Sequence, residues 1–389
     1  MISTLVLVAA VGVGAETIPS KFIGKGATQR VGGYSPIRAE MNDDASAVKK
    51  APEGLGAPKY GMVKLGDKSF GFILDEPEGK DARLFVDGNA DGDFTNDGAA
   101  QWASRKMGNL TMYDGNCEVT LAADRRGTVN LYRFDPSDPQ RAALKNTILY
   151  YADYGYELEL DLDGKTFGTF VGGEPTARTS LWIDRDGNKI RSAKREMVAV
   201  GRPFNFTGTT YELKMGDNGL QLAKAENELP VTPLPPDLSV GKKAPPFKMT
   251  ALDGKEIEFP KSYTGKLVMI DFWATWCGPC IAELPNVKKA YETWHDKGFE
   301  ILGVSFDRQD MAEKVAAFTK EKGMPWAQIY EGKMWDTTLG EIYDVSGIPF
   351  VLLVDGDSGE IVATVRNLRG PGLSEFIGKA LEKKNRDVQ

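Results

Sequence analysis

A proline-rich stretch divides this chain of 389 residues into two parts with different sequence patterns. Residues 225–246 read AENELPVTPLPPDLSVGKKAPP and contain six prolines. Proline has a fixed φ and no backbone N–H, so this stretch disfavours helix and central strand and favours an extended spacer. Because a chain of this length usually forms two or three domains, we expect a boundary near residue 236 and a C-terminal domain over 236–389.

The part before the spacer has the pattern of a β protein. Between residues 58 and 235 it contains short alternating segments rich in β-branched and aromatic residues, such as YGMVKLG, SFGFIL and YELELDL. Asp-Gly and Asn-Gly turn signals lie between these segments. We therefore expect a mostly antiparallel β region over 58–235, preceded by an irregular lead-in over 16–57.

The β region is similar to itself at a fixed spacing. At an offset of 97 residues and without gaps, LGDKSFGFIL (65–74) aligns with LDGKTFGTFV (162–171), and LFVDGNAD (84–91) aligns with LWIDRDGN (181–188). The two alignments share six identical positions. We interpret the similarity as an internal duplication of one β unit. Chance similarity between two hairpins is the alternative.

The part after the spacer alternates strands and helices. KLVMIDFWA and FEILGVSFD are apolar runs typical of buried strands. Between them, apolar residues recur every three or four positions from Cys277 to about Lys297, which predicts a helix with one buried face. A second helix is expected to end at Gly323, followed by the strand pair GIPFVLLVDGDSGEIVATVR and the helix SEFIGKALEKK. This order predicts an α/β layer fold.

Two cysteines in the motif CGPC lie at the start of the first of these helices. A helix N-terminus favours a thiolate, which is the reactive form of cysteine, and Pro279 suits the first helical turn. We expect Cys277 to attack and Cys280 to resolve, so that the pair cycles between dithiol and disulfide. A zinc site would lack ligands, because beyond the pair only Cys117 and His295 are available. A purely structural disulfide would close too short a loop to stabilise the fold much.

Several segments after the spacer resemble a known family. DFWATWCGPC, Pro285 within the helix and VSGIPFVLLVD resemble the thioredoxin fold. LSVGKKAPPFKMTALDGKEIEF and GFEILGVSFD resemble, more narrowly, the TlpA/ResA-like family of envelope thiol-disulfide oxidoreductases. The resemblance covers about residues 238–387 and does not extend to 16–235. It implies an α/β thioredoxin-like C-terminal domain that acts as a protein-disulfide oxidoreductase and needs no cofactor for its redox chemistry.

The resemblance also implies roles for residues around the cysteines. Cys277 is expected to be the exposed nucleophile, and Pro349 matches the family's cis-proline, which faces the cysteine pair. Backbone groups of Ile348 are expected to hold an extended target strand. The residues expected to bind the target are Trp276, Gly278, Pro279 and Ile348.

Two acidic residues flank the cysteine pair. Glu283 follows Cys280 by one helical turn, and Asp271 lies in a buried strand before Cys277, where many TlpA-like proteins have Asn. Two carboxylates near one thiolate are expected to raise each other's pKa and to accept the proton of Cys280. The alternatives are an acid that complements the helix dipole for Glu283 and a hydrogen-bonded strand residue for Asp271.

An aspartate-rich loop in the β region has the spacing of a calcium-binding loop. DGNADGDFTNDG, residues 87–98, places oxygen-bearing side chains at positions 1, 3, 5 and 7, with Gly at position 6. Position 12 is Gly98, so the usual bidentate Glu is missing, and Asp97 is a substitute. The same residue types are also typical of a plain hairpin turn. DRDGN (184–188) is a weaker case. The expected Ca²⁺ ligands are Asp87, Asn89, Asp91 and Asp93.

The remaining features indicate location and partners. The net charge of -7 gives no reason to expect nucleic-acid binding. Residues 1–15 resemble a signal peptide, and we expect no transmembrane segment. Together with the family resemblance, this predicts a periplasmic or secreted protein that reduces cysteine-containing envelope proteins and is recharged by a membrane electron donor of the DsbD/CcdA type.

The alternatives to this function are a β-domain binding module with an accessory redox domain, and a thiol peroxidase. Cys117 is expected to be buried and inert.

Overall fold

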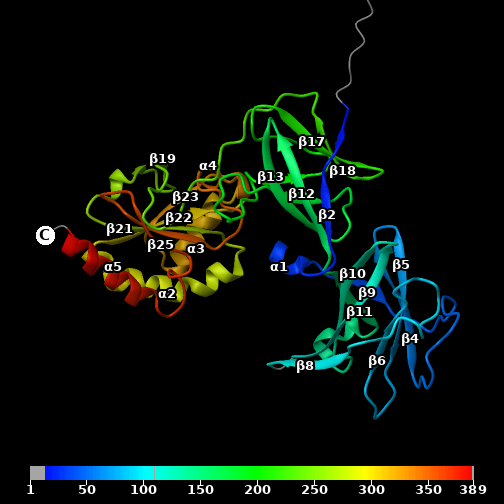
Figure 1. Cartoon of the computed structure of the whole chain (residues 1–389). Helices are drawn as coiled ribbons and strands as arrows, with labels where there is room; N and C mark the ends of the chain where they lie inside the picture. The colour runs from blue at the N-terminus through cyan, green and yellow to red at the C-terminus, as the bar shows by residue number, and fades with distance from the viewer. Residues whose placement is uncertain (1–13, 109, 388–389) are drawn as a thin grey trace, which may run out of the picture. The chain divides into compact units, whose positions relative to one another are not determined.

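The computed structural model describes residues 14–108 and 110–387, and its chain divides into two compact units. The first unit comprises the residues up to Arg191 together with Glu196–Pro233. The second comprises Ser192–Arg195 and the residues from Leu234 onward. Figure 1 shows the first unit in blue to green and most of the second in yellow to red.

The second unit is built on one mixed sheet of five strands in the order β23-β22-β21-β24-β25. β21, β22 and β23 pair in parallel, whereas β24 and β25 complete the sheet with antiparallel pairings. The central strand β21 lies between β22 and β24, and all of its residues are buried. The strands are β21 (Leu267–Trp273), β22 (Phe299–Ser305), β23 (Ala327–Tyr330), β24 (Phe350–Asp355) and β25 (Ile361–Thr364).

Helices connect and cover this sheet. α2 joins β21 to β22, and α3 joins β22 to β23, as parallel strand pairs require. α2 and α5 pack against each other along one side of the unit (Figure 1). This architecture confirms the thioredoxin-like fold expected for the C-terminal domain. The remaining elements are β19 (Phe247–Thr250), β20 (Glu256–Phe259), η2 (Lys261–Tyr263), α2 (Gly278–Trp294), η3 (His295–Lys297), α3 (Ala312–Lys322), η4 (Met334–Asp336), α4 (Thr338–Ile342) and α5 (Leu373–Asp387).

The first unit consists of several small sheets, and every pairing between its named strands is antiparallel. This confirms the mostly antiparallel β region. The sheet orders are β4-β5-β6-β7, β3-β11-β10-β9-β8, β13-β12-β2, β1-β18-β17-β16 and β14-β15. The elements from residue 58 onward are β4 (Pro58–Leu65), β5 (Lys68–Asp75), β6 (Arg83–Val86), β7 (Ala99–Ala100), β8 (Ala103–Met107), β9 (Leu110–Ala122), β10 (Arg125–Phe134), η1 (Pro139–Leu144), β11 (Thr147–Ala152), β12 (Gly155–Leu162), β13 (Lys165–Gly172), β14 (Ser180–Trp182), β15 (Met197–Ala199), β16 (Pro203–Asn205), β17 (Thr210–Gly216) and β18 (Gly219–Lys224).

The lead-in over 16–57 contains three short strands and one short helix before residue 41, whereas residues 41–57 form no named element. β1, β2 and β3 add edge strands to sheets whose other strands come much later in the chain. Such short strands are held by partners distant in sequence, so a local alternation pattern is too brief to reveal them. The elements of this segment are β1 (Glu16–Thr17), β2 (Ser20–Ile23), α1 (Ala27–Val31) and β3 (Ile37–Glu40).

The two segments that align in sequence form equivalent hairpins. β4 and β5 form one hairpin and β12 and β13 form another, and corresponding strands begin 97 residues apart. Phe70 and Leu84 are buried in one apolar core, and their counterparts Phe167 and Leu181 are buried in a second core. The aligned apolar residues therefore have the same structural role in each hairpin unit.

Candidate active site

The two cysteines form a disulfide in the first turn of α2. Cys277 is the N-cap residue with an extended backbone, and the N–H of Cys280 donates to its Sγ at 3.2 Å. Pro279 occupies the first turn, where a missing N–H leaves no helical hydrogen bond unmade. A thiolate on Cys277 would therefore meet a free N–H and the positive end of the helix dipole.

The disulfide is less accessible than the sequence predicted. Cys277 is 4% exposed and Cys280 is 7% exposed, and both belong to the apolar core of the second unit. The expectation of an exposed Cys277 is wrong for this oxidised state, because each half of the disulfide packs against that core. Trp276 is 49% exposed, and Gly278 and Pro279 are also exposed. A target protein would therefore meet these three residues around the disulfide.

A buried carboxylate fixes the loop that precedes the disulfide. Asp307 is fully buried after β22 and accepts hydrogen bonds from Thr275, one from its N–H at 3.0 Å and one from its hydroxyl at 2.5 Å. Ser305 donates its hydroxyl to the same carboxylate at 2.9 Å. These bonds hold the chain two residues before Cys277. We did not predict this role for Asp307. Its only signal was a Ser-x-Asp sequence at the end of an apolar run.

Pro349 lies at the same edge of the sheet as the disulfide loop. The Ile348–Pro349 peptide bond is cis, as the family resemblance implied, and both residues are half-buried. Pro349 directly precedes Phe350 of β24, which pairs with Phe272 near the end of β21. The strand that leads into the cysteines and the strand that follows the cis-proline are therefore adjacent.

Asp271 is buried near the end of β21, and the charge of Glu283 acts on it. Asp271 is 7% exposed, and burial raises its pKa to about 7. The positive charge of Arg369 opposes this rise, and the negative charge of Glu283 adds to it. Glu283 accepts hydrogen bonds from the N–H of Gly370 at 2.5 Å and from the side-chain amide of Asn286 at 2.9 Å. Asp271 can therefore take up or release a proton near neutral pH.

These features define a class of protein, a thioredoxin-fold domain with a disulfide at a helix N-terminus. A family model described as AhpC/TSA family matches residues 240–367. The thiol-disulfide oxidoreductase ResA of Bacillus thuringiensis subsp. konkukian is 33% identical over 146 residues, which are 38% of this chain and 79% of that protein. The thiol:disulfide interchange protein HelX of Rhodobacter capsulatus is 30% identical over 149 residues, which are 38% of this chain and 77% of that protein.

Through its second unit, the chain belongs to the ResA-like family of thiol-disulfide oxidoreductases. It is thus a thioredoxin-like protein-disulfide oxidoreductase. Among solved structures, the thioredoxin domain of a thiol-disulfide oxidoreductase from Bacteroides vulgatus is 34% identical, with a TM-score of 0.33. That likeness covers 37% of this chain and 99% of the other.

Cys117 lies in the first unit and is half-buried, not fully buried as expected. It is a free cysteine on β9, whereas the disulfide belongs to the second unit. Burial raises the pKa of its thiol to about 12, so it remains protonated at neutral pH.

In the loop over residues 87–98, side-chain oxygens accept hydrogen bonds from the loop's own backbone, and Asp93 also forms an ion pair with Lys50 at 3.1 Å. Asp87 is buried and accepts the N–H groups of Asp91 and Gly92 at 3.1 and 2.8 Å. Asn89, Asp91 and Asp93 each accept an N–H from two residues further on. A hairpin turn and a calcium loop share this bonding pattern. Asp97 lies beside Gly88, where a Cβ would be 3.3 Å from Oδ1 of Asp97, and burial and the negative charge of Asp87 raise the pKa of Asp97.

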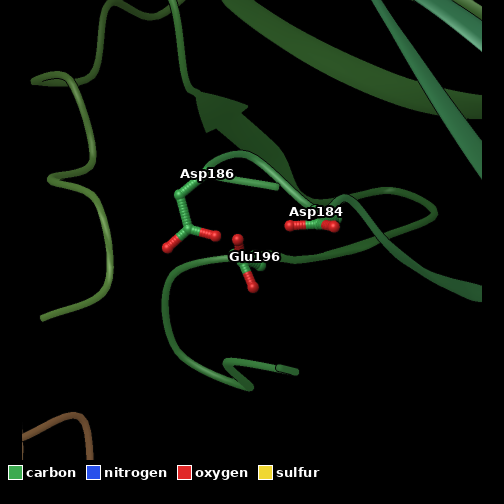
Figure 2. Close-up of side chains that lie close together, drawn as sticks. All are labelled: Asp184, Asp186 and Glu196. Atoms are coloured by element: carbon green, nitrogen blue, oxygen red, sulfur yellow. The ribbon is translucent and has the colours of Figure 1, made fainter. Parts of the chain in front are cut away.

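Three other acidic side chains of the first unit lie close together (Figure 2). Among the described residues, Asp184, Asp186 and Glu196 have carboxylate oxygens that all lie within 4.8 Å of one another. Glu196 accepts the N–H of Arg185 at 2.9 Å and the indole N–H of Trp182 at 3.0 Å. The sequence pointed only weakly to this loop and missed Glu196, which comes from beyond the loop, next to the strand that pairs with β14.

The first unit also contains a cavity of about 610 Å³. Tyr34 lines it, is 52% exposed, and stacks on Tyr151 with 3.9 Å between ring centroids. Tyr154 also lines it, and the hydroxyl of Tyr154 is buried without a hydrogen-bond partner. The cavity therefore combines an accessible aromatic ring with an unsatisfied polar group.

Proposed function

We propose that this chain is an envelope thiol-disulfide oxidoreductase that reduces disulfides in cysteine-containing proteins. The observation that carries the proposal is the Cys277–Cys280 disulfide in the first turn of α2, with the N–H of Cys280 directed at Cys277. The names of the relatives, thiol-disulfide oxidoreductase and thiol:disulfide interchange protein, support protein substrates.

The proposed reaction has two exchange steps. The Cys277 thiolate attacks one sulfur of the substrate disulfide, forms a mixed disulfide and releases the other substrate sulfur as a thiolate. Cys280 then loses its proton and attacks Cys277, which breaks the mixed disulfide and forms the Cys277–Cys280 disulfide. Two electrons pass to the substrate, which leaves as a dithiol. Ionised Asp271 accepts the proton of Cys280 in the second step.

The proposed location and electron donor rest on the sequence. The expected signal peptide over residues 1–15 falls almost wholly outside the described residues. Within the described part of the chain, no helix has both the length and the apolar character needed to cross a bilayer. We expect a membrane donor of the DsbD/CcdA type to return two electrons to the disulfide after each turnover.

The reduction potential of the disulfide tests the direction of electron flow. For a reductant, we expect a value near that of thioredoxin, about −270 mV, after equilibration of the full chain in dithiothreitol buffers. A value near that of the envelope oxidant DsbA, about −120 mV, would show that the disulfide is donated outward and would contradict the reductant role.

The binding-module alternative is supported by the cavity of the first unit. It treats the redox domain as an accessory to a site around Tyr34. It predicts that a Cys277→Ala/Cys280→Ala chain still binds its partner and that Tyr34→Ala does not.

The peroxidase alternative is supported only by the description of the matched family model. Thr275, the threonine nearest the disulfide in sequence, is already engaged by Asp307.

We propose that the two hairpin units arose by duplication.

We also propose that the loop over residues 87–98 binds calcium. The observation that favours calcium is the position of Asp97 beside Gly88 at the start of the loop, because a carboxylate there adds a charged oxygen ligand to those of Asp87 and Asp91. Millimolar Ca²⁺ is expected to raise the melting temperature of the full chain by about 5 °C. Asp87→Ala/Asp91→Ala is expected to abolish the shift, whereas Asp67→Ala, in an exposed turn, keeps it. An equal shift in both variants would refute the site.

A further inference from the structure

Two exposed apolar side chains of the second unit lie in loops near the disulfide. Among the described residues after the spacer, 247–387, the large apolar side chains that are exposed are those of Trp276 at 49% and Met334 at 38%. Trp276 directly precedes Cys277, and Met334 begins the short turn η4 after β23. Single exposed apolar side chains are common on protein surfaces, whereas a contiguous group marks a binding site. These two side chains therefore indicate a binding surface only if they are connected.

Trp335 connects the two side chains. It follows Met334 in sequence, is half-buried, and packs edge-to-face on Trp276 with 6.0 Å between ring centroids. It also packs edge-to-face on Phe306, with 5.4 Å between ring centroids, and Phe306 is fully buried. The indole of Trp335 therefore joins the exposed ring of Trp276 to the core of the second unit. We call Trp276, Met334 and Trp335 together the apolar rim.

One buried residue anchors both loops of the apolar rim. The carboxylate of Asp307 accepts the N–H and the hydroxyl of Thr275, the residue before Trp276, at 3.0 and 2.5 Å. The backbone carbonyl of Asp307 accepts the N–H of Met334 at 3.4 Å. The rim is thus formed before any target arrives, and a preformed surface loses less conformational freedom on binding.

The backbone of Met334 is in a conformation that is uncommon for a large side chain. Its φ is 51°, in the left-handed region that favours glycine. Residues in this region persist where the surrounding structure holds them, and they cluster at sites that bind ligands. The exposed position of Met334 is therefore maintained against its own backbone preference.

A target that reaches the disulfide must cover the apolar rim. Cys277 is 4% exposed, so a target cysteine reaches its sulfur only through close contact with the residues around it. Trp276 is the neighbour of Cys277 in sequence, and Trp335 packs on Trp276. The charged residues that flank Met334 and Trp335 are Lys333 and Asp336, which have opposite signs and favour no target of one charge. Apolar contact is therefore the property by which the rim distinguishes targets.

We propose that the apolar rim binds a large apolar side chain that lies next to the attacked cysteine of the target polypeptide, and that it selects substrates in this way. This inference rests on the proposed function, in which Cys277 forms a mixed disulfide with the target. It adds Met334 and Trp335 to the residues that contact the target. Tryptophan supplies a large rigid surface, and methionine adapts to side chains of different shape.

The expected effect is a preference between substrates that differ in one type of side chain. Burial of a phenylalanine side chain favours binding by about tenfold or more relative to a polar side chain, and the open shape of a surface favours the lower value. We therefore expect the reduced chain to react about tenfold faster with a peptide that has Phe beside its cysteines than with one that has Ser there.

The test uses two such peptides, each closed by one disulfide and identical except for Phe or Ser beside each cysteine. The second-order rate constant of the reduced full chain with each peptide is measured by acid quenching and mass spectrometry, and the readout is the ratio of the two constants. We expect Met334→Ser to lower the ratio to about threefold, and Trp335→Ala, which also removes the support of Trp276, to about twofold. Met215→Ser, at a methionine of the first unit that is 41% exposed, is the matched control and keeps the wild-type ratio.

The ratio separates docking from a purely structural effect, because damage to the site slows both peptides alike and leaves the ratio unchanged. Equal rate constants for the two peptides in the wild type would overturn the selection of apolar targets. The wild-type ratio in both Met334→Ser and Trp335→Ala would overturn the assignment to the apolar rim. A reduced wild-type chain that reacts with neither peptide would instead refute the proposed function, whereas a missing preference alone would not.

Discussion

Cys277→Ser abolishes the reduction of a disulfide substrate, with an expected loss on the order of 10³-fold or more. Cys277 is the residue whose sulfur meets the N–H of Cys280 at the start of α2, and a serine hydroxyl there is not ionised at neutral pH. Cys280→Ser is expected to complete the first attack and then stop, because no second thiol is present to break the mixed disulfide.

The difference between these two variants is measured by mass spectrometry of the chain after incubation with an excess of a disulfide-bonded peptide. Cys280→Ser is expected to carry one peptide on Cys277, and Cys277→Ser none. Cys117→Ser serves as the matched control and should behave like the wild type, since Cys117 is half-buried and its thiol has a raised pKa. A stable adduct on Cys280 in the Cys277→Ser chain would reverse the assigned roles.

Asp271→Asn is expected to stabilise the oxidised chain at alkaline pH. Burial raises the pKa of Asp271 to about 7 in the folded state, against 3.8 for the unfolded chain. Below about pH 4 the carboxyl is protonated in both states and has no effect on stability. As the pH rises towards 7, the unfolded state loses the proton while the folded state keeps it, so stability falls. Above pH 7 the full difference is up to about 4 kcal/mol, and Asn removes it.

The same substitution is expected to impair the reaction. The second exchange step of the wild type should accelerate as the pH rises through about 7, because the Asp271 carboxylate then becomes available as a proton acceptor. Asn cannot accept the proton, so we expect this step to slow by about 10²-fold at pH 8 and to lose the rise near pH 7. Urea unfolding at several pH values and rapid-mixing kinetics measure the two effects. An Asp271→Asn chain that is no more stable at pH 8 would contradict the raised pKa.

The redox unit was predictable because its signals are local. The apolar run before Cys277, the turn chemistry of the CGPC motif and the spacing of apolar residues along α2 each predict their element without knowledge of the rest of the chain. The thioredoxin-like fold and the cis bond at Pro349 followed from the family resemblance. The side chains that support the site were less predictable. Asp307 reaches the site from another segment, and its role depends on strand pairing.

In the first unit, more features depend on segments that are distant in sequence, so fewer of them could be predicted. Its strong hairpins, such as β4–β5 and β12–β13, were evident from alternation and turn residues. β1, β2 and β3 were missed because they are short and gain their hydrogen bonds from strands more than a hundred residues away. Glu196 was missed for a similar reason, since strand pairing brings it to the loop of Asp184.

The proposed function depends on disulfide exchange between the Cys277–Cys280 pair and a protein substrate. To measure this exchange, the reduced full chain is mixed with disulfide-bonded insulin, and thiols are mapped on both proteins after one turnover. We expect one Cys277–Cys280 disulfide formed for each insulin disulfide lost, with Cys117 still a thiol. Intact insulin, together with oxidation of the chain only when hydrogen peroxide is added, would refute disulfide exchange and support the peroxidase alternative.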